Sequence, residues 1–164
     1  MKKLKKTSLL PLLAALVLIF LYNVIFSPQE NDSEGGFDYS ALSENGGALV
    51  DQLDEDGYYY SAEEVAAYIH VFKHLPDNFI TKNEAQSLGW NGGSLNKIAE
   101  GMCIGGDHFG NFEGKLPAGK DYTECDVNCP KNSRGEERII FSDDGWIYYT
   151  PDHYETFETL YVGK

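Results

Sequence analysis

The stretch "SAEEVAAYIHVFKHLP", residues 61–76, marks the beginning of the folded region. Ser61 and Glu64 have the spacing of a capping box, in which two side chains satisfy backbone N–H groups at the start of a helix. Pro76 follows the pattern, as is common just after a helix ends. Three apolar residues fall on one helical face: Val65, Ile69 and Phe72. The stretch therefore predicts an amphipathic helix that packs against a core.

Two shorter helices are expected next. The run "TKNEAQSLGW", residues 81–90, carries a second capping box from Thr81 to Glu84 and stops at Gly89. A third helix is expected around residues 95–99. Short runs rich in β-branched and aromatic residues follow, separated by Gly, Pro, Asn and Asp: "MCIGGDHF" (102–109), "DYTECDVN" (121–128), "ERIIFS" (137–142), "GWIYYT" (145–150) and "HYETFETLYV" (153–162).

The predicted helices precede the predicted strands, which is the order typical of an α+β domain. We expect the N-terminal helices to pack on one face of a twisted antiparallel β-sheet.

The beginning of the chain differs from the rest in charge and composition. Residues 1–26 carry a net charge of +4, residues 27–62 carry −9 and residues 63–164 carry −8, which together make the −13 of the whole chain. A basic start before the apolar run at residues 9–26 is typical of an export signal or a membrane anchor, and the sequence leaves both open. Residues 27–60 are rich in Ser, Gly, Asn and acid, which predicts a disordered linker or pro-segment in which nothing packs. The domain is therefore expected at residues 61–164, secreted or tethered to the outer face of the cytoplasmic membrane.

Three cysteines would meet an oxidising compartment after export, where disulfides persist. All three lie in or beside strand-like segments, and we expect Cys103 to pair with Cys125 or with Cys129. A bond between Cys125 and Cys129 is disfavoured, because an extended strand holds their Cα atoms ~13 Å apart. No fourth cysteine or nearby histidine completes a zinc set, so no metal site is expected.

The sheet half contains few residues suited to acid–base chemistry. In a strand, Glu124 shares a face with Asp126, while Cys125 points to the opposite face. A polar face of this kind suits a sheet with one side open to a ligand, although a solvated face gives the same pattern. The candidates for proton transfer and charge stabilisation are Glu124, Asp126, His153, Arg134, Arg138 and Lys82.

Arg134 and Arg138 stand out because the domain has few basic residues. Two arginines at this spacing could bind a phosphate through paired N–H groups. They could instead form ion pairs with Glu136 and Glu137, and spacing alone favours those ion pairs.

Three long segments have the order and spacing of one known family: "HLPDNFITKNEAQSLGW" (74–90), "IGGDHFGNFEGKLP" (104–117) and "WIYYTPDHYETF" (146–157). They resemble the microbial guanyl-specific ribonucleases of the barnase type, and the resemblance covers residues 61 to about 161. It implies an α+β fold with helices before a twisted antiparallel sheet, as expected above. It also implies an endoribonuclease that acts on single-stranded RNA without a cofactor.

The resemblance assigns roles to residues of this chain. It implies that Glu124 is the general base and His153 the general acid, and that Tyr154 lines the site. The implied phosphate-binding cations are Lys82, Arg134 and Arg138. The implied guanine-recognition loop consists of Phe109, Gly110, Asn111, Phe112 and Glu113, in which backbone amides and the Glu113 carboxylate read the base.

The implied reaction is a transesterification. Glu124 takes the proton of the RNA 2′-hydroxyl, the 2′-oxygen attacks the adjacent phosphorus, and His153 gives a proton to the departing 5′-oxygen. A 2′,3′-cyclic phosphate forms and is hydrolysed with the two roles reversed. Because the substrate supplies the nucleophile, no metal is needed.

The chain departs from the family in several places. Phe112 stands where the family commonly has a basic residue, Met102 replaces a common lysine, and the domain is acidic, which predicts weak nonspecific attraction to polyphosphate. Two alternatives stay open: a catalytically silent RNA-binding module tethered to the surface, and the same enzyme used as an antibacterial toxin with a barstar-like inhibitor protein. We expect a monomer.

Overall fold

The structure is a computed structural model that describes residues 49–164, all within the unit that spans residues 35–164. The predicted export segment and most of the predicted linker lie outside the described residues. Within residues 49–164, no helix has the length and apolar character needed to cross a bilayer. The elements follow in the order α4 (Ala62–Phe72), β1 (Phe79–Ile80), α5 (Lys82–Ser87), the 3₁₀ helix η1 (Leu95–Lys97), β2 (Cys103–Phe109), β3 (Tyr122–Asp126), β4 (Arg138–Ser142), β5 (Ile147–Thr150) and β6 (Glu158–Tyr161).

The strands form one six-stranded sheet in chain order, from β1 to β6. Strands β2 to β6 pair antiparallel, which confirms the α+β prediction. Strand β1 differs from the prediction, because it pairs parallel to β2 with Phe79 opposite Cys103. A two-residue strand is too short to show the alternation by which strands are predicted.

Both predicted capping boxes are present. The Ser61 hydroxyl accepts from the N–H of Glu64, whose carboxylate accepts from the N–H of Ser61, and Thr81 and Glu84 make the same exchange at α5. Helix α4 is capped at its C-terminal end by Lys73, whose backbone is left-handed with φ 66°. The third helix is shorter than predicted, because only residues 95–97 form a 3₁₀ turn.

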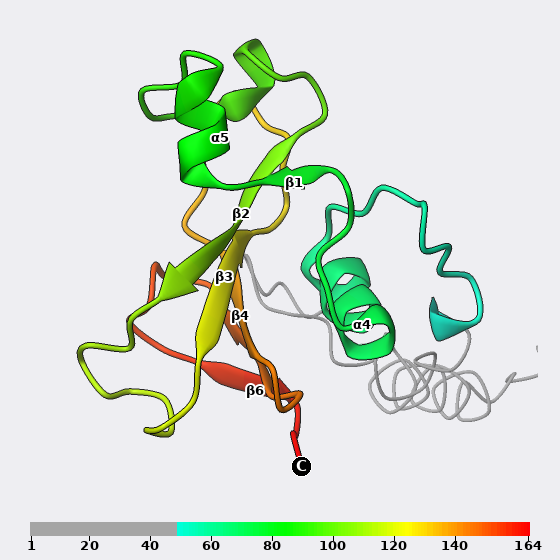
Figure 1. The fold of residues 1–164 in the computed structure, drawn as a ribbon, viewed down its shortest axis with the longest axis vertical. Helices are drawn as coiled ribbons and strands as arrows, with labels where there is room; N and C mark the ends of the chain where they lie inside the picture. The colour runs from blue at the N-terminus through cyan, green and yellow to red at the C-terminus, as the bar shows by residue number, and fades with distance from the viewer. Residues whose placement is uncertain (1–48) are drawn as a thin grey trace, which may run out of the picture. The chain divides into compact units, whose positions relative to one another are not determined.

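The two faces of the sheet have different neighbours. Helix α4 covers one face and α5 lies beside β2 at one end of the sheet (Figure 1). The core under α4 takes Val65, Ala66 and Ile69 from the helix and Cys125, Val127, Ile139, Phe141, Ile147 and Tyr149 from the sheet. The other face carries a smaller cluster of Leu116, Tyr122, Ile140 and Tyr148. It also carries buried charged residues, which form the candidate site.

The packed structure begins before the predicted boundary at Ser61. Tyr59 packs against the core under α4, and its backbone exchanges hydrogen bonds with the Asn78 side chain. The Tyr68 hydroxyl donates to the Glu55 carbonyl over 2.7 Å. The expectation that nothing in residues 27–60 packs is therefore wrong for this last part. Aromatic side chains there find apolar surface in spite of the acidic residues around them.

One disulfide joins Cys103 to Cys129, with the Cα atoms 6.0 Å apart. This is one of the two pairings expected for Cys103. Cys125 is a buried free cysteine, and burial raises the pKa of its thiol well above the usual range.

Candidate active site

Strand pairing assembles the centre of the site. Asp126 of β3 lies opposite Arg138 of β4, which lies opposite Thr150 of β5. Glu124 occupies the same face of β3 as Asp126, one pleat away. Glu124 is 7% exposed, Asp126 6% and Arg138 2%, so three charged groups are buried on this face of the sheet. Buried charges are retained only where partners satisfy them. Asp126 and Arg138 form an ion pair, and the partners of Glu124 are Lys82 and Tyr154.

The Glu124 carboxylate is held from two sides. Its Oε1 accepts a hydrogen bond from Lys82 Nζ at 2.5 Å, and its Oε2 accepts from the Tyr154 hydroxyl at 2.6 Å. The pKa of Tyr154 is raised, mainly by burial and secondly by the hydrogen bond to Glu124. The phenol therefore stays protonated and donates its hydrogen to the carboxylate. The two contacts orient the carboxylate, and each oxygen keeps a second acceptor direction for a substrate hydroxyl.

A bulge in β2 helps to place Lys82. The register between β2 and β3 shifts between Gly105 and Asp107, so that Asp107 lies opposite Glu124. The Asp107 carboxylate accepts a hydrogen bond from the backbone N–H of Lys82 over 2.9 Å. Because Lys82 is the first residue of α5, this contact fixes the helix start and directs the lysine over Glu124. Gly105 is required beside the bulge, since a Cβ there would lie 2.6 Å from the Cβ of Cys125.

The two arginines share Asp126 as their partner. Arg134 donates from Nε and Nη2 to the two carboxylate oxygens, at 2.7 and 2.8 Å. Arg138 Nε lies 2.9 Å from Asp126 Oδ1, as an ion pair without hydrogen-bond geometry. Arg138 Nη1 donates to the carbonyls of Gly135 and Glu137. The expected ion pairs with Glu136 and Glu137 are therefore wrong, because strand register places Arg138 opposite Asp126 and the loop places Arg134 on the same carboxylate.

His153 lies at the edge of this cluster. It is exposed, and its ring centroid lies 4.7 Å from that of Tyr154, the residue bonded to Glu124. His153 and Tyr154 both have left-handed backbone, with φ 54° and 76°, a conformation that non-glycine residues seldom adopt. The Thr150 hydroxyl accepts from the N–H of Tyr154, and the Glu136 carbonyl accepts from the N–H of His153. These bonds hold the turn that presents the imidazole to solvent.

The predicted guanine loop follows the end of β2. Phe109 packs on Tyr154, with ring centroids 5.2 Å apart, so the loop begins against the site. Asn111, with φ 44°, organises the loop because its side chain exchanges hydrogen bonds with the backbone of Leu116. Phe112 is 95% exposed, and its ring lies over Gly110. Glu113 is exposed beside it.

Lys115 was missed by the sequence analysis. Its Nζ donates to the backbone carbonyls of Tyr154 and Glu155, at 2.8 and 3.0 Å. The lysine thereby ties the predicted guanine loop to the turn that carries His153. Its partners are backbone carbonyls, which no side-chain pattern in a sequence identifies.

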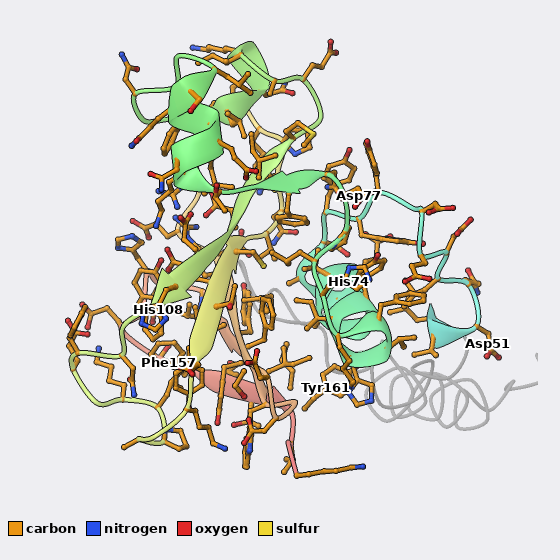
Figure 2. All side chains as sticks on the ribbon, viewed as in Figure 1. Asp51, His74, Asp77, His108, Phe157 and Tyr161 are labelled. Atoms are coloured by element: carbon orange, nitrogen blue, oxygen red, sulfur yellow. A yellow bond between two sulfur atoms is a disulfide. The ribbon has the colours of Figure 1, made fainter. Side chains whose placement is uncertain are left out.

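The remaining histidines lie elsewhere or make no contact with this cluster. His74 lies near Asp77 on the α4 side of the sheet, whereas His108 lies at the C-terminal end of β2 (Figure 2). His74 pairs with Glu55 at 3.3 Å, and a hydrogen bond to the Leu75 carbonyl raises its pKa. Within residues 49–164, no three His, Cys, Asp or Glu side chains are grouped as a metal site requires.

The geometry brings together the side chains that the resemblance nominates. A carboxylate, a lysine and a tyrosine are in direct contact, two arginines lie on the adjacent carboxylate, and an exposed imidazole lies tilted beside the tyrosine. Such a site can accept a proton, donate a proton, and stabilise negative charge between them. Asp126 was a candidate for proton transfer, but its contacts make it the residue that positions both arginines.

Comparisons with known proteins identify the family of this chain. A family model described as ribonuclease matches residues 62–161. A ribonuclease of Bacillus intermedius is 37% identical over 164 residues, which covers 95% of this chain and 99% of the relative. A ribonuclease of Heyndrickxia coagulans is 46% identical over 100 residues, 58% of this chain and 92% of the relative. Guanyl-specific ribonuclease St of Saccharopolyspora erythraea is 42% identical over 60 residues, 35% of this chain and 59% of the relative. The chain therefore belongs to the microbial ribonuclease family of the barnase type, and it is an endoribonuclease that acts on RNA.

Proposed function

We propose that this endoribonuclease is exported and cleaves single-stranded RNA after guanosine, by transesterification to a 2′,3′-cyclic phosphate. The observation that carries the mechanism is the Glu124 carboxylate, oriented by Lys82 Nζ and the Tyr154 hydroxyl on a buried sheet face. A carboxylate held in this way is a positioned acceptor for the 2′-hydroxyl proton.

The other side chains complete the reaction. Once the 2′-oxygen attacks phosphorus, negative charge grows on the phosphoryl oxygens, and the remaining N–H groups of Arg134 and Arg138 stabilise it. His153, in its protonated form, gives a proton to the 5′-oxygen as the P–O5′ bond breaks. Water then opens the cyclic phosphate, with His153 as base and Glu124 as acid. The substrate supplies its own nucleophile, so we propose that the reaction is independent of metal ions.

The roles of Glu124 and His153 can be tested separately in the full chain. Glu124→Gln and His153→Ala should each lower kcat ~10²–10⁴-fold, the usual contribution of an acid or base. The matched controls are Glu100→Gln and His74→Ala, which change the same residue types at exposed positions away from the site. Circular dichroism checks that each variant is folded. Near-parental rates in both site variants would show that the assignment is wrong.

The base preference depends on the loop at residues 109–113. Guanine presents an N1–H and an exocyclic amine to a carboxylate acceptor and an O6 to backbone N–H donors. We propose that Glu113 and the loop amides fill these roles, and guanyl-specific ribonuclease St among the relatives supports a guanosine preference.

Glu113→Ala tests this reading of the base. It should reduce cleavage after guanosine far more than after the other bases, with Glu100→Ala as the control. Dinucleotide substrates with each base in the first position measure this effect. Equal rates on all four in the parent would mean that the loop does not read the base.

Export is tested by assaying ribonuclease activity in medium, membrane and cytoplasm of cells that produce the full chain. Activity confined to the cytoplasm would contradict export. A monomeric state and a barstar-like inhibitor stay predictions from the resemblance. Gel filtration and a search for a tight-binding protein from the same cells would test them.

A further inference from the structure

Arg134 differs from the other charged residues of the site because it lies in a loop. Glu124, Asp126 and Arg138 lie in paired strands, whereas residues 127–137 connect β3 to β4 without regular structure. The Arg134 guanidinium contacts the Asp126 carboxylate and lies over the ring of Trp90. The distance from Arg134 Cζ to the centroid of that ring is 5.9 Å. The position of Arg134 therefore depends on where this loop is held.

The disulfide anchors this loop to the sheet. Cys129 lies in the loop, between Asp126 and Arg134, and Cys103 is the first residue of β2, 1% exposed. In the part of the loop before Arg134, hydrogen bonds also run from Asn128 N–H to the Tyr60 carbonyl and from the Ser94 hydroxyl to the Lys131 carbonyl. The end of the loop is held separately, because the Glu136 carbonyl accepts from the N–H of His153 and the Glu137 carboxylate accepts from the Tyr149 hydroxyl. Cys103, Cys129 and Arg134 also line one small cavity, so the disulfide and the arginine lie close together.

We propose that the Cys103–Cys129 disulfide positions Arg134 for phosphate binding, so that the ribonuclease reaches its full rate only in its oxidised form. This inference rests on the proposed function, in which Arg134 stabilises the transition state. Reduction by an external dithiol converts the oxidised form to the reduced form. The S–S bond breaks, Cys103 and Cys129 each gain an electron and a proton, and the dithiol becomes a disulfide.

The effect should be confined to the loop. Arg138 keeps its pairing with β3 and β5, and Glu124 keeps Lys82 and Tyr154. His153 keeps its turn, because the bond from its N–H goes to Glu136 at the end of the loop, next to β4. Cys125 does not replace either partner, because it is buried and its thiol stays protonated at neutral pH. Reduction should therefore displace one cation and leave the proton-transfer pair in place.

The experiment compares initial rates of the full chain on single-stranded RNA, before and after reduction with dithiothreitol. Reduction should lower kcat ~10- to 10²-fold, no more than Arg134→Ala does, with little change in KM, because a misplaced transition-state contact affects kcat. The variant lacking both cysteines, Cys103→Ser with Cys129→Ser, should have the reduced rate and ignore dithiothreitol. Near-ultraviolet circular dichroism of the same samples gives the folded fraction, and each rate is divided by it.

Arg134→Ala separates the possible outcomes. In this background, reduction should cause no further loss. If Arg134→Ala keeps the parental rate, the proposed role of Arg134 is wrong. If Arg134→Ala is impaired but reduction leaves the parent unaffected, only the present inference is overturned. It is also overturned if reduction lowers the rate equally in both backgrounds, or unfolds the domain completely, because the disulfide would then act on the whole fold.

Discussion

Replacing Asp126 by asparagine should destabilise the domain strongly, because this carboxylate neutralises two arginines. Arg134 makes two hydrogen bonds to it and Arg138 an ion pair at 2.9 Å. Removing one member of a buried ion pair typically costs about 3–5 kcal/mol, since the partner's charge stays buried. Arg134 is partly exposed and solvent compensates its charge, so most of the cost comes from Arg138, 2% exposed. Two carbonyls still accept from Arg138, and we therefore expect the lower end, about 3 kcal/mol.

Urea unfolding of the full chain at pH 7 measures this cost. With a slope of about 2 kcal/mol per molar urea, the midpoint should fall by about 1.5 M. Asp121→Asn is the matched control, because it makes the same chemical change at an exposed residue beside the same strand and should cost less than about 0.5 kcal/mol. A loss below about 1 kcal/mol for Asp126→Asn would refute the reasoning that Asp126 stabilises the buried arginine.

Three further outcomes are expected. Cys129→Ser should lower the unfolding free energy by about 3–4 kcal/mol, because the bond closes a loop with a sequence separation of 26, and a loss under about 1 kcal/mol in urea unfolding would contradict this. Cys125 should resist iodoacetamide at pH 8 in the native protein and react after unfolding, since burial raises its pKa, and mass spectrometry that finds native labelling would disagree. Phe112→Arg, at a position 95% exposed, should steepen the plot of log kcat/KM against log salt by about 0.7, and an unchanged slope would place this loop away from the phosphates.

Local signals in the sequence predicted most of the fold. The capping boxes at Ser61 and Thr81 depend on residues a few positions apart, and both helices begin where these boxes predict. The five antiparallel strands lie within the predicted runs, because each run is bounded by turn residues. The parallel strand β1 was missed since its two residues carry no periodicity.

Contacts that depend on strand register could not be predicted from one sequence. The partner of Arg134 and Arg138 is Asp126, which is opposite Arg138 only because of the pairing between β3 and β4. The spacing of the arginines indicated neighbouring glutamates instead. The packing of Tyr59 was missed because its partners are distant in the chain: Asn78 lies 19 residues away, and most of the core it packs against comes from the strands.

The most direct test of the proposed mechanism is the chemistry of the RNA ends. The full chain is incubated with a defined single-stranded RNA in excess chelator, and early products are analysed by mass spectrometry. The mechanism predicts fragments that end in a 2′,3′-cyclic phosphate after guanosine, partners that begin with a 5′-hydroxyl, and no cleavage where the 2′-hydroxyl is replaced by hydrogen. Fragments with 5′-phosphate and 3′-hydroxyl ends, or activity that vanishes in chelator and returns with a divalent cation, would contradict it.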